Sequence, residues 1–410
     1  MSLTKLNRAL AEEIRNLESQ GRKKPPERVI VAVKKPALDR GPRFYLYGAG
    51  KKGFICMNSN SYLGLGLCNE LIRGEETAGR KFGVGPGAVR FISGTFRPHV
   101  DLENRLADFH DRDAAIIMGS AYSASLGVLS QLITESTLII SDELNHNCII
   151  NAMRLARPIG KMIYPHNNTA DLEKKLNEAI EQPRVKRVII VTDGIFSMRG
   201  DCAPLAKIKF LSEEYGTCFP EGVITVMDDS HGVGAFGKTG RGTEEHTGAR
   251  ADILIGTLGK AFGVNGGYAA ASEEVIEYLR NTAPMYIFSN PISPGEAAAA
   301  LAAIDLVDSH LGRELLTGLR EKTRLFREGL KDAGFETFEG DHPVVPLLTR
   351  NTDLAHSISK HLFEHGVLAS PIVYPVVPRG EEEIRFQVSA AHTEKDLRMV
   401  LKALRSFKGQ

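Results

Sequence analysis

Short apolar runs alternate with helical patterns through the middle of the chain, between residues 61 and 294. Each run has the length of a buried strand, and strands that alternate with helices predict a mostly parallel sheet covered by helices. Polar residues follow several of these runs, and open α/β sheets bind ligands at the carboxyl ends of their strands. The predicted strands are Ala114–Met118, Thr137–Ile140, Lys161–Tyr164, Arg187–Val191, Val223–Met227 and Ile253–Ile255.

The two flanks of this region have different patterns. Apolar residues at helical spacing predict a helix over Leu3–Leu17, and the alternation over Arg43–Met57 indicates a hairpin. We therefore expect an N-terminal segment over residues 1–60, a large domain over 61–294 and a smaller α+β domain over 295–410. The last of these combines helices over Glu296–Leu306, Arg313–Ala333, Asp353–His365 and Glu394–Phe407 with strands over Val344–Leu348, Val367–Tyr374 and Glu383–Val388.

One predicted strand leads into a short turn that carries a lysine. Ile253–Ile255 is followed by a Gly-rich turn with Thr257, and Lys260 ends that turn. A lysine held in such a turn can be desolvated, which favours its neutral and nucleophilic form. An aldehyde cofactor needs an amine of this kind, although an ordinary surface lysine is the alternative.

The strand before it ends in a carboxylate and an imidazole. Asp228 follows Val223–Met227, and His231 comes shortly after Asp228. A carboxylate at a strand end can pair with the protonated ring nitrogen of pyridoxal phosphate (PLP), and this pairing makes the ring an electron sink. The imidazole would reach the phenolic oxygen of the same ring. The alternative is a capped strand end and a solvated histidine in a Gly-rich loop.

Asp228, His231, Thr257 and Lys260 together resemble the site of PLP-dependent enzymes with the aspartate aminotransferase fold. Five further motifs resemble the α-oxoamine synthase family, and within it they are most similar to the 2-amino-3-ketobutyrate CoA ligases (glycine C-acetyltransferases). The similarity runs from about residue 58 to the C-terminus. It implies an α/β chain of PLP-dependent transferase fold type I, with a smaller C-terminal α+β domain. The motifs are Tyr62–Leu65, Val89–Thr95, Asp142–His146, Thr192–Met198 and Ser389–Thr393.

The resemblance implies an acyltransferase that condenses a small amino acid, glycine for the ligases, with an acyl-CoA thioester. Lys260 would carry PLP and then remove the Cα proton, while Asp228 would keep the ring nitrogen protonated. Pro86–Ala88 and Arg97–Pro98 depart from the ligase pattern, which leaves the acyl donor open. The other members considered resemble 8-amino-7-oxononanoate synthase, 5-aminolevulinate synthase or serine palmitoyltransferase.

The resemblance also assigns further cofactor contacts. The start of the helix after Ala114–Met118 would bind the PLP phosphate, because a helix N-terminus offers unpaired N–H groups and a positive dipole. Ser120 is also readable as an ordinary N-cap. The family more often has Asn at Ser125, and no role is assigned there. The implied phosphate residues are Ser120, Ala121, Tyr122 and Thr257, with Ser289 and Asn290 reaching the phosphate of a neighbouring subunit.

Three polar residues after other strands complete the predicted pocket. His146 would lie over the cofactor ring and hydrogen-bond a substrate carbonyl. Asp193 is either an acid near the substrate or an orienting residue for Asp228 and His231. Ser197 would donate to the cofactor phenolate or to a substrate carbonyl, and a plain strand-to-loop turn is the alternative for both.

Two residues are candidates for the amino acid's carboxylate. Arg385 begins a predicted strand of the small domain, and its guanidinium fork suits a carboxylate. Asn60 is the second candidate. The role of Ser289 and Asn290 implies a homodimer with shared sites.

Composition excludes several other classes. The 51 basic and 50 acidic residues leave a net charge of +1, so neither nucleic acid nor a membrane surface is expected as a partner. The five cysteines have no metal-site spacing and suggest free thiols in a reducing compartment. No apolar run approaches the roughly 20 residues of a membrane span, and the first residues lack a signal-peptide core. We expect a cytoplasmic enzyme without a metal.

An aminotransferase or lyase of the same fold is a rival, since it would share the cofactor pocket. A PLP-free scaffold protein is another, but it would not need Asp228, His231 and Lys260 together.

Overall fold

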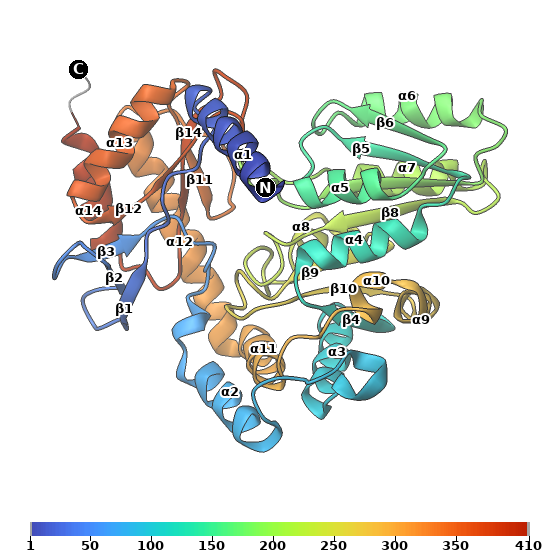
Figure 1. The fold of residues 1–410 in the computed structure, drawn as a ribbon, viewed down its shortest axis with the longest axis horizontal. Coiled ribbons are helices and arrows are strands. Elements are labelled where there is room, and N and C mark those ends of the chain that lie inside the picture. Colours follow the sequence, from blue (N-terminus) through green and yellow to red (C-terminus); the bar gives the residue numbers. More distant parts are fainter. Residues whose placement is uncertain (1, 408–410) are drawn as a thin grey trace. The chain divides into compact units, whose positions relative to one another are not determined.

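The computed structural model describes residues 2–407, which group into two compact units (Figure 1). The larger unit comprises Asn60–Glu321 and Glu339–Pro343. The smaller unit comprises the residues up to Ser59, Lys322–Phe338 and the residues from Val344 onward. Each is described separately below.

The larger unit is built on a seven-stranded sheet with the order β4-β10-β9-β8-β7-β5-β6. All neighbouring pairs among β9, β8, β7, β5 and β6 are parallel, and only β10 runs antiparallel to its neighbours β4 and β9. The mostly parallel sheet is therefore confirmed, and each predicted strand is present. The strands are β4 (Ala114–Met118), β5 (Thr137–Asp142), β6 (Gly160–Tyr164), β7 (Arg187–Asp193), β8 (Val223–Asp228), β9 (Ile253–Thr257) and β10 (Gly267–Ala271).

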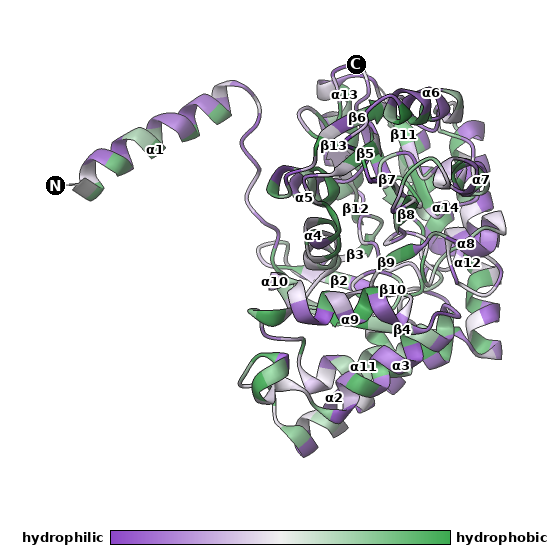
Figure 2. Ribbon diagram, turned by 90° about the vertical axis from the view of Figure 1, so that its right-hand side faces the viewer, coloured by the Kyte–Doolittle hydropathy of each residue, from purple (hydrophilic) through white to green (hydrophobic). Residues whose placement is uncertain are grey.

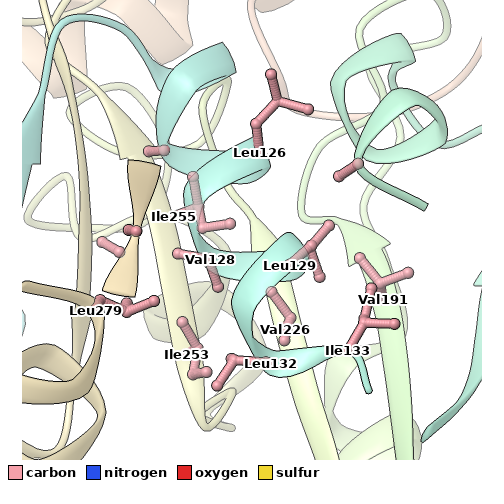
Figure 3. Packing of buried hydrophobic residues seen from close by; sticks show 14 of the residues in the cluster. Leu126, Val128, Leu129, Leu132, Ile133, Val191, Val226, Ile253, Ile255 and Leu279 are labelled. Atoms are coloured by element: carbon pink, nitrogen blue, oxygen red, sulfur yellow. The ribbon is translucent and has the colours of Figure 1, made fainter. Parts of the chain in front are cut away.

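Helices cover this sheet, and the main core lies between one sheet face and α4 (Ala121–Leu132). Leu126, Val128, Leu129 and Leu132 of α4 pack against strand residues that include Val226 and Ile255 (Figure 3). Burying apolar side chains on both partners stabilises such a layer by roughly 25 cal/mol per Å². The other helices around the sheet are α5 (Asn147–Leu155), α6 (Thr169–Ile180), α7 (Leu205–Gly216) and α9 (Glu273–Thr282). Along α9, polar and apolar residues alternate in patches, as expected for a helix with one buried face (Figure 2).

A second group of helices belongs to the same unit. Helix α11 (Pro294–Val307) packs on α2 (Asn69–Phe82) and α3 (Arg97–Phe109). The contact is close because both sides carry small residues; a Cβ at Gly74 would lie 3.3 Å from the backbone oxygen of Ala298. The chain thus divides after Glu321, whereas the sequence-based boundary lies at residue 294. Helix α11 belongs to the larger unit because it packs closely on α2 and α3.

The remaining elements of the larger unit are short. They are η1 (Leu65–Leu67), η2 (Arg90–Gly94), α8 (Thr243–Thr247) and α10 (Pro284–Ile287). Helix α12 (His310–Asp332) contributes residues to both units.

The smaller unit contains two small sheets and four helices or helix segments. One sheet has the order β1-β2-β3-β12 and the other β11-β14-β13. The strands are β1 (Ile30–Lys34), β2 (Arg43–Leu46), β3 (Gly53–Cys56), β11 (Val344–Leu348), β12 (Val367–Leu368), β13 (Ser370–Ile372) and β14 (Glu383–Gln387), and the helices besides α12 are α1 (Ser2–Ser19), α13 (Thr352–Glu364) and α14 (Glu394–Arg405). The predicted hairpin is formed by the antiparallel pair β2 and β3. Over residues 2–407, no helix is both long and apolar enough to cross a bilayer.

Candidate active site

A pocket of about 250 Å³ opens beyond the carboxyl ends of β7, β8 and β9 in the larger unit. It brings together ten residues that the sequence predicted for the cofactor. The residues from that prediction are Ser120, Ala121, Tyr122, His146, Asp193, Ser197, Asp228, His231, Thr257 and Lys260, and the lining also includes Cys148, Ile195 and Ser230. Asn60, Ser289, Asn290 and Arg385 are not part of this lining.

The strand register explains why these residues meet. Asp193 ends β7 and lies opposite Asp228, which ends β8, while Thr257 ends β9. Parallel strands end at the same edge of a sheet, so side chains that follow each strand converge there. Lys260 follows in the turn after β9 and is half-buried.

Asp228 is buried and held by donors from three segments. Its Oδ2 accepts a hydrogen bond from the Ser125 hydroxyl at 3.0 Å, and its Oδ1 accepts one from the Ser230 backbone N–H at 3.1 Å. The Cys148 thiol lies 3.5 Å from Oδ2. Donors of this kind favour the ionised carboxylate, which is the form that would pair with a protonated ring nitrogen. No role was predicted for Ser125 or Cys148.

Asp193 is the second buried carboxyl group of the pocket. Burial raises its pKa well above the usual range, and the nearby charge of Asp228 raises it further. Its backbone N–H donates to the Asn145 side chain at 2.8 Å. Among the described residues, no hydrogen-bond partner is found for its buried Oδ1. The two carboxyl groups thus differ in surroundings, because Asp228 accepts hydrogen bonds from Ser125 and Ser230 while one oxygen of Asp193 has none among the described residues.

A third carboxyl group, Asp229, is buried next to Asp228 and packs against the loop after β7 and the connection between β8 and α8. It accepts hydrogen bonds of 2.7 Å from both the backbone N–H and the hydroxyl of Thr243. A Cβ added at Gly194, Gly232 or Gly242 would lie within 2.2 Å of its carboxylate oxygens. Burial raises the pKa of Asp229 to about 7, although the Thr243 bonds oppose the rise. Glycine at these three positions is therefore required by the space that Asp229 fills.

His231 is buried and fixed on two sides. Its Nδ1 forms a 2.6 Å hydrogen bond with the Tyr62 hydroxyl, and its backbone oxygen accepts one of 2.9 Å from His342 Nε2. Tyr62 also donates to Asn60 Oδ1 at 3.4 Å, which connects Asn60 to the site indirectly. Tyr62 belongs to a motif that the sequence singled out, but its bond to His231 depends on residues 169 positions apart.

His146 lies at the N-terminus of α5. It is the N-cap residue, and its Nδ1 accepts from the Cys148 backbone N–H at 3.3 Å. Burial lowers the pKa of His146; the charge of Asp228 opposes this shift, and that of Lys260 adds to it. The imidazole is therefore neutral near pH 7.

The predicted phosphate-binding residues lie at the N-terminus of α4. Ser120 is the N-cap of α4, and its hydroxyl accepts from the Ser123 backbone N–H at 3.0 Å. The β10 strand passes so close to this end of α4 that a Cβ at Gly267 would lie 2.1 Å from the Ala121 nitrogen. Unpaired N–H groups of a first helical turn suit a phosphate, and the Thr257 hydroxyl lines the same pocket. The donor set fits PLP, with an amine, an anionic carboxylate and a helix N-terminus in one pocket.

The other predicted residues lie elsewhere. Ser289 and Asn290 are exposed, just after α10. Arg385 lies on β14 of the smaller unit, where the Gln387 side chain accepts from its Nε at 2.6 Å in the amide orientation that satisfies both residues.

Comparisons with known proteins agree with this chemistry. Residues 52–404 match the family model "Aminotransferase class I and II". The 8-amino-7-oxononanoate synthase of Thermosipho melanesiensis is 42% identical over 86% of this chain and 87% of its own, and that of Geobacter metallireducens is 39% identical over 96% of both chains.

Solved structures show the same fold. The serine palmitoyltransferase of Sphingomonas wittichii superposes with a TM-score of 0.87 at 26% identity, covering 98% of this chain and 97% of that one. The enzyme of the same name from S. paucimobilis, solved with bound PLP–myriocin, has a TM-score of 0.86 at 26% identity and covers 97% and 96%.

These relatives support the predicted family and favour a different member of it. The sequence motifs were most similar to the ligases that use glycine, whereas the sequence relatives named above are 8-amino-7-oxononanoate synthases, which the sequence had given as an alternative. Both members belong to one family and share the cofactor motifs, so the motifs that were quoted could not separate them. This chain belongs to the class I and II aminotransferase family and is a PLP-dependent enzyme of the α-oxoamine synthase type.

Proposed function

We propose that this enzyme makes an α-aminoketone of the 8-amino-7-oxononanoate type. The observation that carries the proposal is the 42% identity to a synthase of that name over 86% of the chain. The named product is a nine-carbon acid whose ketone lies next to an amine-bearing carbon. Dividing it between those two carbons gives a seven-carbon acyl group with a free carboxylate and a two-carbon amine. The two-carbon amine corresponds to alanine without its carboxyl group.

The proposed reaction joins alanine to that acyl group, supplied as a thioester. A bond forms between Cα of alanine and the acyl carbonyl carbon, the thiol leaves, and the alanine carboxylate departs as carbon dioxide. When bound, PLP supplies an aldehyde that takes up amines and a pyridinium ring that withdraws electrons from Cα.

We assign the residue roles as follows. Lys260 holds the cofactor and, once its amine is free, removes the Cα proton. Asp228 keeps the ring nitrogen protonated, and hydrogen bonds from Ser125 and Ser230 hold its carboxyl group in place. His231 and Ser197 bind the phenolic oxygen, and His146 packs over the ring. Asp193, whose pKa is raised by burial and by the charge of Asp228, is the second carboxyl group beside the ring.

Substrate binding and assembly remain proposals from the sequence. Arg385 and Asn60 are the proposed contacts of the alanine carboxylate. Ser289 and Asn290 are proposed to reach the phosphate of a second subunit in a homodimer, and their exposure after α10 agrees with that role. We also propose a cytoplasmic location, since the five cysteines are free thiols.

Product analysis tests the function. The purified enzyme, loaded with PLP, is incubated with alanine, glycine or serine and with CoA thioesters of a seven-carbon dicarboxylic acid, acetate or palmitate, and the products are identified by mass spectrometry. The proposal predicts the nine-carbon aminoketone from alanine and the dicarboxylic thioester. Lys260→Ala is the control and should give no product.

One competing outcome follows from the sequence motifs. The five motifs quoted from the sequence were together most similar to the ligases that use glycine and an acetyl thioester. A product from glycine and acetyl-CoA alone would replace the proposed substrates while leaving the family assignment intact.

A further inference from the structure

His146 caps a helix with its ring, and this fixes where its proton is. The Cys148 backbone N–H donates to Nδ1 at 3.3 Å. A backbone N–H is always a donor, so a ring nitrogen that faces it must act as an acceptor and carry no proton. Asn, Asp, Ser and Thr are the usual residues for this position, and a histidine can replace them only through an unprotonated nitrogen.

The thiol of Cys148 also requires Nδ1 of His146 to be a hydrogen-bond acceptor. Its sulfur lies 2.9 Å from His146 Nδ1 and is buried. Burial raises the pKa of this thiol far above its usual value, so the sulfur keeps its hydrogen and is a donor. The same sulfur lies 3.5 Å from Asp228 Oδ2, a longer approach, and that oxygen already accepts from Ser125 at 3.0 Å. Nδ1 is therefore the nearer of two acceptors for the thiol hydrogen, and the carboxylate of Asp228 is the second.

The protonation of the second ring nitrogen, Nε2, follows from the neutral charge of the imidazole. A neutral imidazole carries one proton, and with Nδ1 bare that proton must be on Nε2. In the described part of the chain, no residue is hydrogen-bonded to Nε2. His146 also lines the cofactor pocket.

We infer that Cys148 is a positioning residue that holds His146 in the Nε2–H tautomer, so that the imidazole presents a hydrogen-bond donor to a carbonyl oxygen of the substrate. The inference rests on the proposed function for the identity of that carbonyl, and on the geometry alone for the tautomer. The opposite tautomer would turn an acceptor toward an oxygen and repel it. A serine at position 148 would keep the donor, whereas an alanine would remove it.

Nitrogen NMR on protein labelled with ¹⁵N-histidine tests the tautomer directly. The His146 signals are assigned by their loss in His146→Gln. We expect Nδ1 at the shift of an unprotonated ring nitrogen and Nε2 at that of a protonated one. A protonated Nδ1 in neutral His146 overturns the inference, whatever substrates the enzyme uses.

Infrared spectroscopy tests the thiol's part. The S–H band of Cys148, identified by its absence in Cys148→Ser, should lie at the lower frequency of a hydrogen-bonded thiol and move to the free-thiol frequency in His146→Phe. Cys218→Ser is the matched control, since Cys218 is an exposed free thiol outside the pocket lining and its loss should leave the His146 nitrogen shifts unchanged. A band that does not move in His146→Phe contradicts the inference.

Kinetics add a third measurement. Cys148→Ala should lower kcat by roughly tenfold, the effect of about one neutral hydrogen bond, with little change in the KM of the amino acid. Cys148→Ser should recover most of the loss. If Cys148→Ala and Cys148→Ser lose kcat equally while both fold, the role of Cys148 is packing and not proton placement. Absence of the proposed product with an unchanged NMR result would instead count against the proposed function only.

Discussion

Asp228 is the residue on which the electron-withdrawing chemistry depends. Asp228→Asn keeps the shape of the side chain and loses its charge, so the ring nitrogen of the cofactor would no longer be held protonated. We expect PLP to bind and the rate of α-proton exchange of alanine to fall by several powers of ten, at about 1.4 kcal/mol for each tenfold step. Proton NMR in deuterated water measures the exchange. A wild-type rate in this variant would remove Asp228 from the mechanism.

Arg385 is a prediction of the sequence and has a sharp test. Arg385→Lys keeps the charge but loses the planar fork that grips a carboxylate. The variant should bind PLP and stay yellow, but it should need roughly ten- to a hundredfold more alanine to shift the cofactor absorbance, because a bond to a charged group contributes about 1.5–3 kcal/mol. Ethylamine, which has no carboxylate, is the matched ligand and should titrate both proteins alike. Equal alanine titrations would mean that another residue holds the carboxylate.

His166 predicts a pH-dependent stability. Burial lowers its pKa, but hydrogen bonds to Asp142 (3.1 Å) and Asp201 (2.8 Å) raise it to about 9 from 6.5. A raised pKa stabilises the fold fully below the unfolded value and loses that contribution as pH rises through about 9. We expect His166→Asn to be less stable than wild type by up to roughly 3 kcal/mol at pH 6, with the difference shrinking near pH 10. Urea unfolding at both pH values measures it; a constant difference would contradict the ion pairs.

Among individual residues, the sequence predicted those that line the cofactor pocket but not those that hydrogen-bond to them from other helices. Lys260, Asp228 and His146 follow strands or open helices, and that position alone predicts convergence. Ser125 and Cys148 come within reach of Asp228 only because α4 and α5 pack beside β8. A spacing of 103 or 80 residues along the chain carries no signal of that contact.

Among the elements, β10 and the start of α4 form the closest backbone approach in the site. Gly267→Ala would place a Cβ 2.1 Å from the Ala121 nitrogen, whereas a Cβ at Gly119 meets nothing within 4 Å. Backbone on both sides cannot move aside, so we expect Gly267→Ala to lower the free energy of unfolding by at least about 3 kcal/mol. Gly119→Ala is the control and should change it by less than about 1 kcal/mol. Denaturant unfolding of the apoproteins compares the two; equal stabilities would show that α4 can shift.

The strands that were predicted and the one that was missed differ in composition. The six strands predicted in the larger unit are rich in Val and Ile, and all are present. Strand β10 reads Gly-Tyr-Ala-Ala-Ala and was not predicted, because small residues have low strand propensity. Its burial between β4 and β9 is what makes it a strand, and burial is not visible in its own sequence.

For the whole molecule, an exposed apolar surface favours a dimer. Phe91 (67% exposed) and Ile92 (68%) lie on η2, which contacts α10, and Phe288 (78%) follows α10 directly. Large exposed apolar residues gathered on neighbouring segments are typical of an interface. We expect Ile92→Asp to convert a dimer into monomers, as measured by light scattering. Activity should also fall, because Ser289 and Asn290 could no longer reach the cofactor phosphate of a second subunit. Phe210→Asp, on α7, is the exposed control and should leave the mass unchanged; a wild-type monomer would remove the shared site.

The carboxylate of Asp229 limits which substitutions can be accepted at neighbouring glycines during evolution. Three glycines, one after β7 and two between β8 and α8, have no room for even a methyl group, because the two carboxylate oxygens of Asp229 occupy that space. Substitutions at Gly194 and Gly232 are therefore expected to depend on a shorter residue at position 229, whereas Gly242 is also restricted by its positive φ of 82°. Shortening Asp229 would give up the two Thr243 bonds. A deep mutational scan should find larger residues at Gly194 and Gly232 tolerated only together with a shorter residue at Asp229, so a library that varies one position at a time would miss these combinations.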